Sequence, residues 1–343
     1  MDSKLLKADR ARSIATGVLI AYGASEVHSR TVANHLVDSD LSGVPSHGLL
    51  RLPQYVAQIL SGRLSPEATP VVRPGIDHRF DVLAQGCFGQ VACQLGVEES
   101  IRRASATGLA LGSVIGAGHA GRLGAYAEHI GREGFLALIF CSGPRSLGHQ
   151  VAPFNGRQGR LATNPLAFAI PTGGEPIVGD FSTAAAPEGR IRYLRNMGFE
   201  APPDLLLDRY GVPTTDPNVL YDEDPGTILP FGGLRAGHRG FALGLLVEAF
   251  ATLLPGERTT DPRRFGNNVS LLTVSVDPNF AERATDMADY VLSSEARAEH
   301  QVMLPGIPEL RSRLDRDTIQ LDAETWHAIV ELAARRNALI SED

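Results

Sequence analysis

The chain has 343 residues, of which 43% are hydrophobic and 21% are charged, and its formal net charge is −7. This is the composition of an ordinary globular protein, and the length allows two or three domains. Because the chain is acidic and has no block of basic residues, we do not expect it to bind nucleic acid.

Two apolar stretches, 134–141 and 241–254, are shorter than the roughly 20 residues that a membrane-spanning helix needs. The segment 1–13 carries charges on both sides of only two leucines, which is unlike a secretory signal. We therefore expect a protein that does not enter a membrane and that is located in the cytoplasm.

Three helices are predicted at the start of the chain. The first covers 5–22, the second begins at Ser25 or Ser29 and ends near 43, and the third covers about 46–61. In this interpretation Ser46 is the N-cap of the third helix.

From residue 69 onward, predicted strands and helices alternate, which is typical of the α/β class. Strands at 109–115 and 135–141 flank a helix at about 122–132, so this part resembles a βαβ unit. The Pro- and Asp-rich segment 211–231 is expected to have little regular structure. The other predicted elements are helices at 90–107, 241–254, 279–299 and 323–339 and strands at 166–170, 177–181 and 271–276.

Cysteine and histidine patterns argue against a disulfide framework and against a metal site. Cys87, Cys93 and Cys141 are odd in number and form no CxxC pair, so we predict three buried free thiols. The ten histidines form no HExxH motif, and their close pairs have helical spacing, so no metal is expected.

The segment 46–55, SHGLLRLPQY, is a first candidate site. If Ser46 caps a helix, then His47, Arg51 and Tyr55 are four residues apart and share one face. Arginine suits a substrate carboxylate because its planar donors pair with both oxygens, and histidine can give a proton to a carbonyl or imine as a hydride arrives. The alternative is a capping serine followed by surface side chains.

A second candidate is the segment 116–121, GAGHAG, which matches the GxGxxG pattern of a Rossmann fold and lies between a predicted strand and a helix. That fold requires an acidic residue about 20 residues later, and residues 141–145 contain none. Arg145 could instead bind the phosphate of an NADP cofactor. His119 either lines a pocket or is a satisfied turn histidine.

Three further segments, 162–165, 179–183 and 232–240, place glycines, hydroxyls or cations where strands end or helices begin. Backbone amides and side chains of this kind hold the phosphates and ribose of dinucleotides. Each segment is also compatible with a plain turn.

Seven segments cover nearly the whole chain in a characteristic order: VPSHGLLRLPQY (44–55), GHAGRLGAYA (118–127), TNPLAFAIPT (163–172), DFSTAAA (180–186), GVPTTDP (211–217), PFGG with GHRGFAL (230–243) and LPGIPELRSR (304–313). In order and spacing they resemble the malate/L-lactate dehydrogenase family of the second type. That group includes ureidoglycolate dehydrogenase, diketogulonate reductase, sulfolactate dehydrogenase and the piperideine-2-carboxylate reductases.

The resemblance implies an α/β protein with a non-Rossmann nicotinamide-binding fold, an N-terminal helical segment and mixed sheets. We accordingly divide the chain into a helical substrate-side segment at 1–70, a main α/β domain at 71–125 and 290–343, and a nicotinamide-binding domain at 126–289. The resemblance also implies a homodimer with its site near the subunit interface.

By the same resemblance, His47 is the proton donor with Ser46 as its relay neighbour, and Arg51 binds the substrate carboxylate. The histidine that matches His119 has the acid/base role in other members, so two catalytic candidates remain. Besides Arg51, the residues expected at the substrate are Tyr55, Thr163 and Asn164. The expected cofactor contacts are His119, Gly121, Gly143, Asp180, Phe181, Ser182, His238, Arg239, Gly240, Pro305 and Gly306.

Three features depart from the family pattern. Arg239 stands where the family usually has lysine, which preserves the charge but alters the geometry. The segment 189–199 has no carboxylate, although some members have a relay acid there. Arg122 brings a charge close to the expected pocket, which suggests a substrate with an additional anionic or polar group.

The sequence therefore predicts an oxidoreductase that transfers a hydride between a nicotinamide cofactor and the alpha carbon of a small 2-oxo acid or cyclic 2-imino acid. The cofactor is NADPH or NADH, and the available arginines slightly favour NADPH. Two other interpretations stay open: a catalytically silent relative that binds a ligand or assembles, and a hydrolase that uses Ser46 and His47, although no GxSxG elbow is present.

Overall fold

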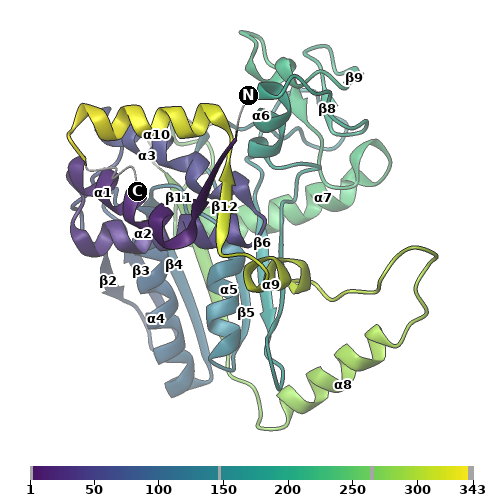
Figure 1. The fold of residues 1–343 in the computed structure, drawn as a ribbon. Helices are drawn as coiled ribbons and strands as arrows, with labels where there is room; N and C mark the ends of the chain where they lie inside the picture. Colours follow the sequence, from purple (N-terminus) through teal and green to yellow (C-terminus); the bar gives the residue numbers. More distant parts are fainter. Residues whose placement is uncertain (1–2, 146–147, 263–265, 339–343) are drawn as a thin grey trace.

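The computed structural model describes residues 3–145, 148–262 and 266–338. Its centre is a seven-stranded sheet with the strand order β2-β3-β4-β11-β5-β6-β7 (Figure 1). β3 and β4 pair in parallel, and the other neighbouring strands are antiparallel, so the predicted α/β class with mixed sheets is confirmed. The strands are β2 (Val71–Pro74), β3 (Arg79–Leu83), β4 (Leu109–Ala117), β5 (Leu136–Ser142), β6 (Leu166–Ile170), β7 (Ile177–Phe181) and β11 (Asn267–Val274).

The expected βαβ-like unit consists of β4, α5 (Leu123–Arg132) and β5, but its two strands are not neighbours. β11 lies between them and pairs antiparallel with both, with Leu271 opposite Gly112 on one side and Ile139 on the other. Consecutive strands are neighbours in only about two-thirds of cases, so the local sequence did not reveal this insertion.

Helix α4 (Gly89–Thr107) and helix α5 lie side by side against the sheet (Figure 1). Both approach it closely: a Cβ at Gly96 would lie 3.0 Å from Cγ2 of Val114, and one at Gly131 would lie 2.9 Å from Cβ of Ala169. The core beneath them contains the predicted free thiols, which are confirmed as buried: Cys87, Cys93 and Cys141.

The opposite face of the sheet is covered by α7 (Gly233–Glu248), which continues into a π turn, η5 (Ala249–Leu253). Phe140 points to this side, because its neighbours along β5 belong to the other core, and it packs against Val247 and Ala251. The helix predicted at 241–254 is therefore confirmed, but it begins at Gly233.

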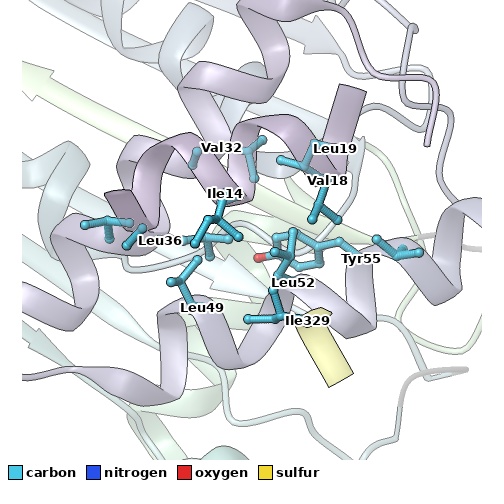
Figure 2. Packing of buried hydrophobic residues seen from close by; sticks show 14 of the residues in the cluster. Ile14, Val18, Leu19, Val32, Leu36, Leu49, Leu52, Tyr55 and Ile329 are labelled. Atoms are coloured by element: carbon cyan, nitrogen blue, oxygen red, sulfur yellow. The ribbon is translucent and has the colours of Figure 1, made fainter. Parts of the chain in front are cut away.

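A second core lies between α1 (Ala8–Ala21), α2 (Glu26–Leu41), α3 (Leu52–Leu60) and the C-terminal α10 (Ala323–Arg335). Figure 2 shows Ile14, Leu36, Leu52 and Ile329 meeting there, with Tyr55 among them. This core joins the two ends of the chain.

The first predicted helix is wrong at its start. Residues expected to be helical from Leu5 form β1 (Lys4–Lys7), which pairs antiparallel with β12 (Thr318–Leu321). Leu6 points into the second core from this strand, so a contact with the far end of the chain overrides the local helical pattern.

The third predicted helix is also wrong at its start. Ser46 is not an N-cap: it lies in a 3-10 turn, η1 (Pro45–His47), which is followed by a second turn, η2 (Leu49–Arg51), before α3 begins. Gly48 between the turns is extended, and the backbone N–H of Leu49 donates to Oδ2 of Asp40 at 2.8 Å. The side chain of Asp40, in α2, thus holds this segment in two short turns.

The remaining elements belong to the second half of the chain. The segment 211–231 contains more structure than predicted, and the helix predicted at 279–299 is shorter. The predicted last helix is confirmed, but it ends at Arg335, before its expected end at 339, a residue that lies outside the described ranges. The elements are α6 (Glu188–Asn196), β8 (Leu206–Leu207), β9 (Pro213–Thr214), η4 (Pro217–Tyr221), β10 (Thr227–Ile228), α8 (Phe280–Leu292) and α9 (Ile307–Leu314).

Figure 1 shows α8 and the long connection to α9 extending away from the sheet. Within the described ranges, no helix has both the length and the apolar character that crossing a bilayer requires.

Candidate active site

Two histidines from distant parts of the sequence meet at the centre of the candidate site. His47 comes from η1, and His119 comes from the segment that follows β4. Their rings stack with centroids 5.4 Å apart and an angle of 25° between the planes. The structure therefore brings together the two catalytic candidates that the sequence left unresolved.

Ser46 and Arg51 complete the side of the site that contains His47. Oγ of Ser46 lies 3.0 Å from Nδ1 of His47. Arg51 is buried, and it donates from Nε to the carbonyl oxygen of Ser46 at 2.7 Å and from Nη1 to Gln54 at 2.8 Å. Nη2 has no hydrogen-bond partner among the described residues, which leaves donors for an anion.

Gly189, at the start of α6, lies directly against the side chain of Arg51. A Cβ at Gly189 would lie 2.9 Å from Nη2 of Arg51 and 3.2 Å from Cβ of Ser46. Glycine therefore allows α6 to approach the site, and Glu188 and Arg192 on the same helix are near enough to influence the pKa of Arg51.

His119 is held from its other side by Tyr55. The hydroxyl of Tyr55 lies 2.8 Å from Nδ1 of His119, and Nε2 of Gln90 donates to the same hydroxyl at 2.8 Å. Tyr55 and Gln90 are each 1% exposed, so the contact between them is buried, while the contact between Tyr55 and His119 is partly buried. Gln90 was not predicted as a site residue, because nothing near it in the sequence marks a site.

Two other residues of the site were not predicted, and the side chain of each holds a backbone segment of the site in place. Asp40 holds η2 through Leu49, and a Cβ at Gly48 would collide with its carboxylate at 1.9 Å. His35 stacks on Tyr126, and its Nε2 accepts from the backbone N–H of Arg122 at 2.8 Å. The role of both residues could not be predicted from the sequence, because they belong to the preceding helix α2 and reach the site only in the folded protein.

Burial sets the protonation of the site. Desolvation, with help from the charge of Arg51, lowers the pKa of His47 to about 3 and the pKa of His119 well below its ordinary value. Burial also lowers the pKa of Arg51, and it raises the pKa of Tyr55 to about 12. Near neutral pH the site therefore contains two neutral imidazoles beside one buried guanidinium.

A second group of predicted residues gathers near the start of α5. The carboxylate of Asp180 accepts from the backbone N–H of Gly124 at 2.6 Å. Although part of this residue reaches solvent, desolvation by the surrounding protein raises the pKa of its carboxyl. Asp180, Gly306 and Arg122 line one pocket, where Gly306 precedes α9.

Arg122 lies between the two groups. It is 4% exposed, and its Nη2 lies 3.5 Å from Oε2 of Glu128, while Nη1 would lie 3.0 Å from a Cβ at Gly124. Its Nε is buried without a hydrogen-bond partner among the described residues. The side chain is thus directed toward Asp180 and α5, and its charge also lowers the pKa of His47.

The predicted residues of the loop 162–165 face α7. Asn164 is fully buried, and its Nδ2 donates to the carbonyl oxygen of Gly244 and to Glu248, both at 3.0 Å. The carbonyl oxygen of Thr163 accepts from Oγ of Ser182 at 3.0 Å, which ties this loop to the end of β7. Gly143 lies beside the same loop, because its Cβ would be 3.3 Å from that of Ala162.

The other predicted cofactor residues lie at three places. Phe181 is 38% exposed and tilts toward Phe231, and Gly121 packs against His35. Pro305 accepts from the backbone N–H of Val178 in β7, which brings Pro305 and Gly306 close to Asp180. A last set lies in α7: His238, whose ring contacts Phe154, the exposed Arg239, and Gly240.

Two neutral imidazoles beside a buried arginine, on a mixed α/β fold, provide the acid/base and anion-binding groups of an enzyme site. The malate/L-lactate dehydrogenase family model matches residues 6–330. The chain therefore belongs to the malate/L-lactate dehydrogenase family, and it is a dehydrogenase.

Three relatives match over most of their length. The chain is 31% identical to hydroxycarboxylate dehydrogenase B of Escherichia coli O157:H7, over 91% of the chain and 88% of the relative. It is 32% identical to L-lactate dehydrogenase of Cupriavidus necator, over 96% and 97%. It is 30% identical to (2R)-3-sulfolactate dehydrogenase (NADP(+)) of Chromohalobacter salexigens, over 92% and 93%.

Solved structures are similar over the same extent. A putative malate/lactate dehydrogenase from E. coli has a TM-score of 0.90 at 28% identity, with 98% of this chain and 96% of that chain covered. The delta1-piperideine-2-carboxylate reductase of Pseudomonas syringae pvar. tomato has a TM-score of 0.83 at 26% identity, with 96% and 100% covered.

Proposed function

We propose that this dehydrogenase transfers a hydride between a nicotinamide cofactor and the alpha carbon of a small 2-oxo acid or cyclic 2-imino acid, or the corresponding 2-hydroxy or cyclic amino acid in reverse. The observation that carries the proposal is the stacked pair of His47 and His119 beside Arg51. The names of the relatives support both substrate types, since they include a hydroxycarboxylate dehydrogenase and a cyclic imine reductase.

Arg51 has the properties of a carboxylate anchor. Its Nε and Nη1 are fixed by Ser46 and Gln54, so the planar group is pre-oriented while Nη2 stays available. In a buried site this charge attracts an anion strongly, and orientation of the substrate alone lowers the barrier to its reaction.

His47 and His119 are placed to handle the proton that accompanies hydride transfer. A neutral imidazole is the form that accepts a hydroxyl proton when a 2-hydroxy acid is oxidised. In the reductive direction, an imidazole must donate to the developing oxyanion or amine, and a substrate carboxylate on Arg51 raises the pKa of His47 because it offsets the cationic field.

The pocket lined by Arg122, Asp180 and Gly306 has groups that suit parts of a dinucleotide. A carboxylate suits ribose hydroxyls, while a buried guanidinium with a free Nε and the N-terminus of α9 suit phosphate. When bound, the nicotinamide supplies or accepts the hydride. We propose that this pocket, together with Ser182 and the end of β7, holds the cofactor on a fold that is not a Rossmann fold.

A spectrophotometric screen tests the proposal. It crosses NADH and NADPH with 2-oxo acids and cyclic imino acids, and the expected result is substrate-dependent loss of the absorbance of the reduced nicotinamide, with NADPH preferred. Binding of both cofactors without any turnover would instead support a catalytically silent relative. The division into three segments and the cytoplasmic location remain predictions from the sequence.

A further inference from the structure

We propose that Gln90 is a positioning residue that fixes His119, through Tyr55, in the tautomer with the proton on Nε2. The inference rests on the proposed function, since it divides the labour between the two histidines. It follows from the two consecutive contacts Gln90–Tyr55 and Tyr55–His119, each 2.8 Å long.

The direction of the hydrogen bonds follows from counting donors. The amide nitrogen of Gln90 can only donate, so the oxygen of Tyr55 accepts from it. The single hydrogen of the Tyr55 hydroxyl is then free for Nδ1 of His119, the other polar atom within reach. A ring nitrogen that accepts carries no proton, so a neutral His119 has its proton on Nε2.

The surroundings keep this arrangement intact. Tyr55 is 1% exposed and its ring packs edge-on against Phe88, so no alternative partner from solvent competes. Burial and the charge of Arg51 lower the pKa of His119, which keeps the ring neutral. A neutral ring carries a single proton, so the position of that proton defines one tautomer.

Packing alone does not explain a glutamine at this position. Oε1 of Gln90 is buried and has no hydrogen-bond partner among the described residues, which is unfavourable for a buried amide. An apolar side chain of similar size would avoid this cost. The hydrogen bond from Nε2 to Tyr55 is thus the one side-chain hydrogen bond that Gln90 makes among the described residues, and it calls for a specific explanation.

The consequence is a division of roles. His119 presents an N–H from Nε2 and acts as a neutral hydrogen-bond donor to the substrate oxygen or nitrogen. His47, whose Nδ1 faces Ser46, carries out the proton transfer. The hydrogen bond polarises the carbonyl without moving a charge into the site, which is one established way to stabilise a developing oxyanion.

The test is nitrogen NMR of the ligand-free protein with 15N-labelled histidine, where His119→Asn identifies the signals among the ten histidines. We expect the pattern of a protonated Nε2 and an unprotonated Nδ1 in the wild type. Gln90→Glu replaces the donor with an acceptor, so Tyr55 turns its hydrogen toward the new carboxylate and the proton of His119 moves to Nδ1.

Gln94→Glu is the matched control, because Gln94 lies one turn further along α4 and donates to Glu98 instead. It should leave the tautomer unchanged. If Gln90→Glu does not fold, Tyr55→Phe serves as the second variant. It removes the hydroxyl that donates to Nδ1 of His119, so the 15N chemical shift of Nδ1 should change to that of a ring nitrogen that accepts no hydrogen bond from Tyr55.

The kinetic readout separates this role from a structural one. Gln90→Glu should lower kcat by about tenfold or more while the KM for the cofactor and the fold are unchanged. A wild-type spectrum with the proton on Nδ1, or a tautomer that Gln90→Glu leaves unaltered, would overturn the inference. Because the spectra need no substrate, failure of the proposed function is seen separately, as absence of turnover.

Discussion

At the scale of single residues, the protonation states in the site depend on the desolvation of His47, His119 and Arg51. One buried guanidinium and two partly buried imidazoles lie together, and the low pKa of His47 and His119 follows from desolvation and from the charge of Arg51. The residue types at 46–55 predicted carboxylate binding and proton transfer, and the structure brings His47, Arg51 and Tyr55 into one site. The roles of these residues stay predictions. The pKa values could not be predicted, because they depend on burial and on neighbours from other elements.

The assignment of the two histidines leads to a first prediction. His47→Ala should lower kcat by about 100- to 10,000-fold, because it removes the group that transfers the proton, and it should leave cofactor affinity intact. Steady-state kinetics and fluorescence titration with the reduced cofactor measure both effects. If turnover survives in this variant and is lost only in His119→Ala, the roles are reversed.

Arg51 should act mainly in substrate binding. Arg51→Lys replaces a fixed planar donor group with a point charge, so we expect the substrate KM to rise by about tenfold with a smaller change in kcat. A series of 2-oxo acids measured with both proteins checks this. An unchanged KM would mean that the substrate carboxylate binds elsewhere.

Asp40 leads to a prediction on stability and pH. Burial raises the pKa of its carboxyl from 3.8 to about 7, so ionisation costs more in the folded than in the unfolded state. The contribution of Asp40 to stability is therefore fully present below about pH 4 and is lost as the pH rises toward 7. Relative to the wild type, the Tm of Asp40→Asn should rise between pH 4 and pH 8.

Asp289→Asn is the control for this effect, because Asp289 is exposed on α8. Its Tm should differ from that of the wild type by nearly the same amount at every pH. If the Tm difference between Asp40→Asn and the wild type is also independent of pH, the raised pKa of Asp40 is contradicted.

At the scale of elements, the segment between α2 and α3 shows how an incorrectly predicted helix still grouped residues that the structure brings together. Spacing by four residues predicted that His47, Arg51 and Tyr55 share one face. Two 3-10 turns replace the start of that helix, yet Arg51 folds back onto Ser46, and Tyr55 reaches His119 from α3. Local pattern identified the residues, whereas the turns depend on Asp40, which the pattern did not include.

Gly48 tests this explanation. A Cβ there would lie 1.9 Å from Oδ1 of Asp40, so Gly48→Ala should displace the turns, lower the Tm and lower kcat. Gly17→Ala is a matched change inside α1, where a Cβ meets nothing within 4 Å, and it should stabilise the protein by about 0.5–1 kcal/mol. Thermal melting and kinetics of both variants provide the comparison, and equal effects would contradict a specific role of Asp40.

At the scale of the whole molecule, the sequence predicted the elements better than their partners. The strands 109–115, 135–141 and 271–276 were predicted, but nothing local placed the third between the first two. The pairing of β1 with β12 was missed for the same reason, since it joins the ends of the chain. The resemblance to a family added the expectation of mixed sheets, but it did not give the strand order either.

The projecting helix α8 supports the proposal of a homodimer. It exposes Met287, Tyr290, Val291 and Leu292, and Tyr290 is 80% exposed. An apolar face of this kind is unfavourable in water, so a second copy of the chain is expected to cover it. Light scattering should give the mass of a dimer for the wild type and of a monomer for Tyr290→Glu combined with Met287→Glu; a wild-type monomer would contradict the proposal.

The central claim is geometric: His47, His119 and Arg51 surround the carbon that gains or loses the hydride. A crystal structure with bound nicotinamide cofactor and an unreactive 2-oxo acid analogue tests it most directly. We expect the carboxylate of the analogue to pair with Nη2 of Arg51, and its alpha carbon to lie between the two imidazoles and C4 of the nicotinamide ring. A ring bound away from the two histidines, or a carboxylate held by other residues, would contradict it.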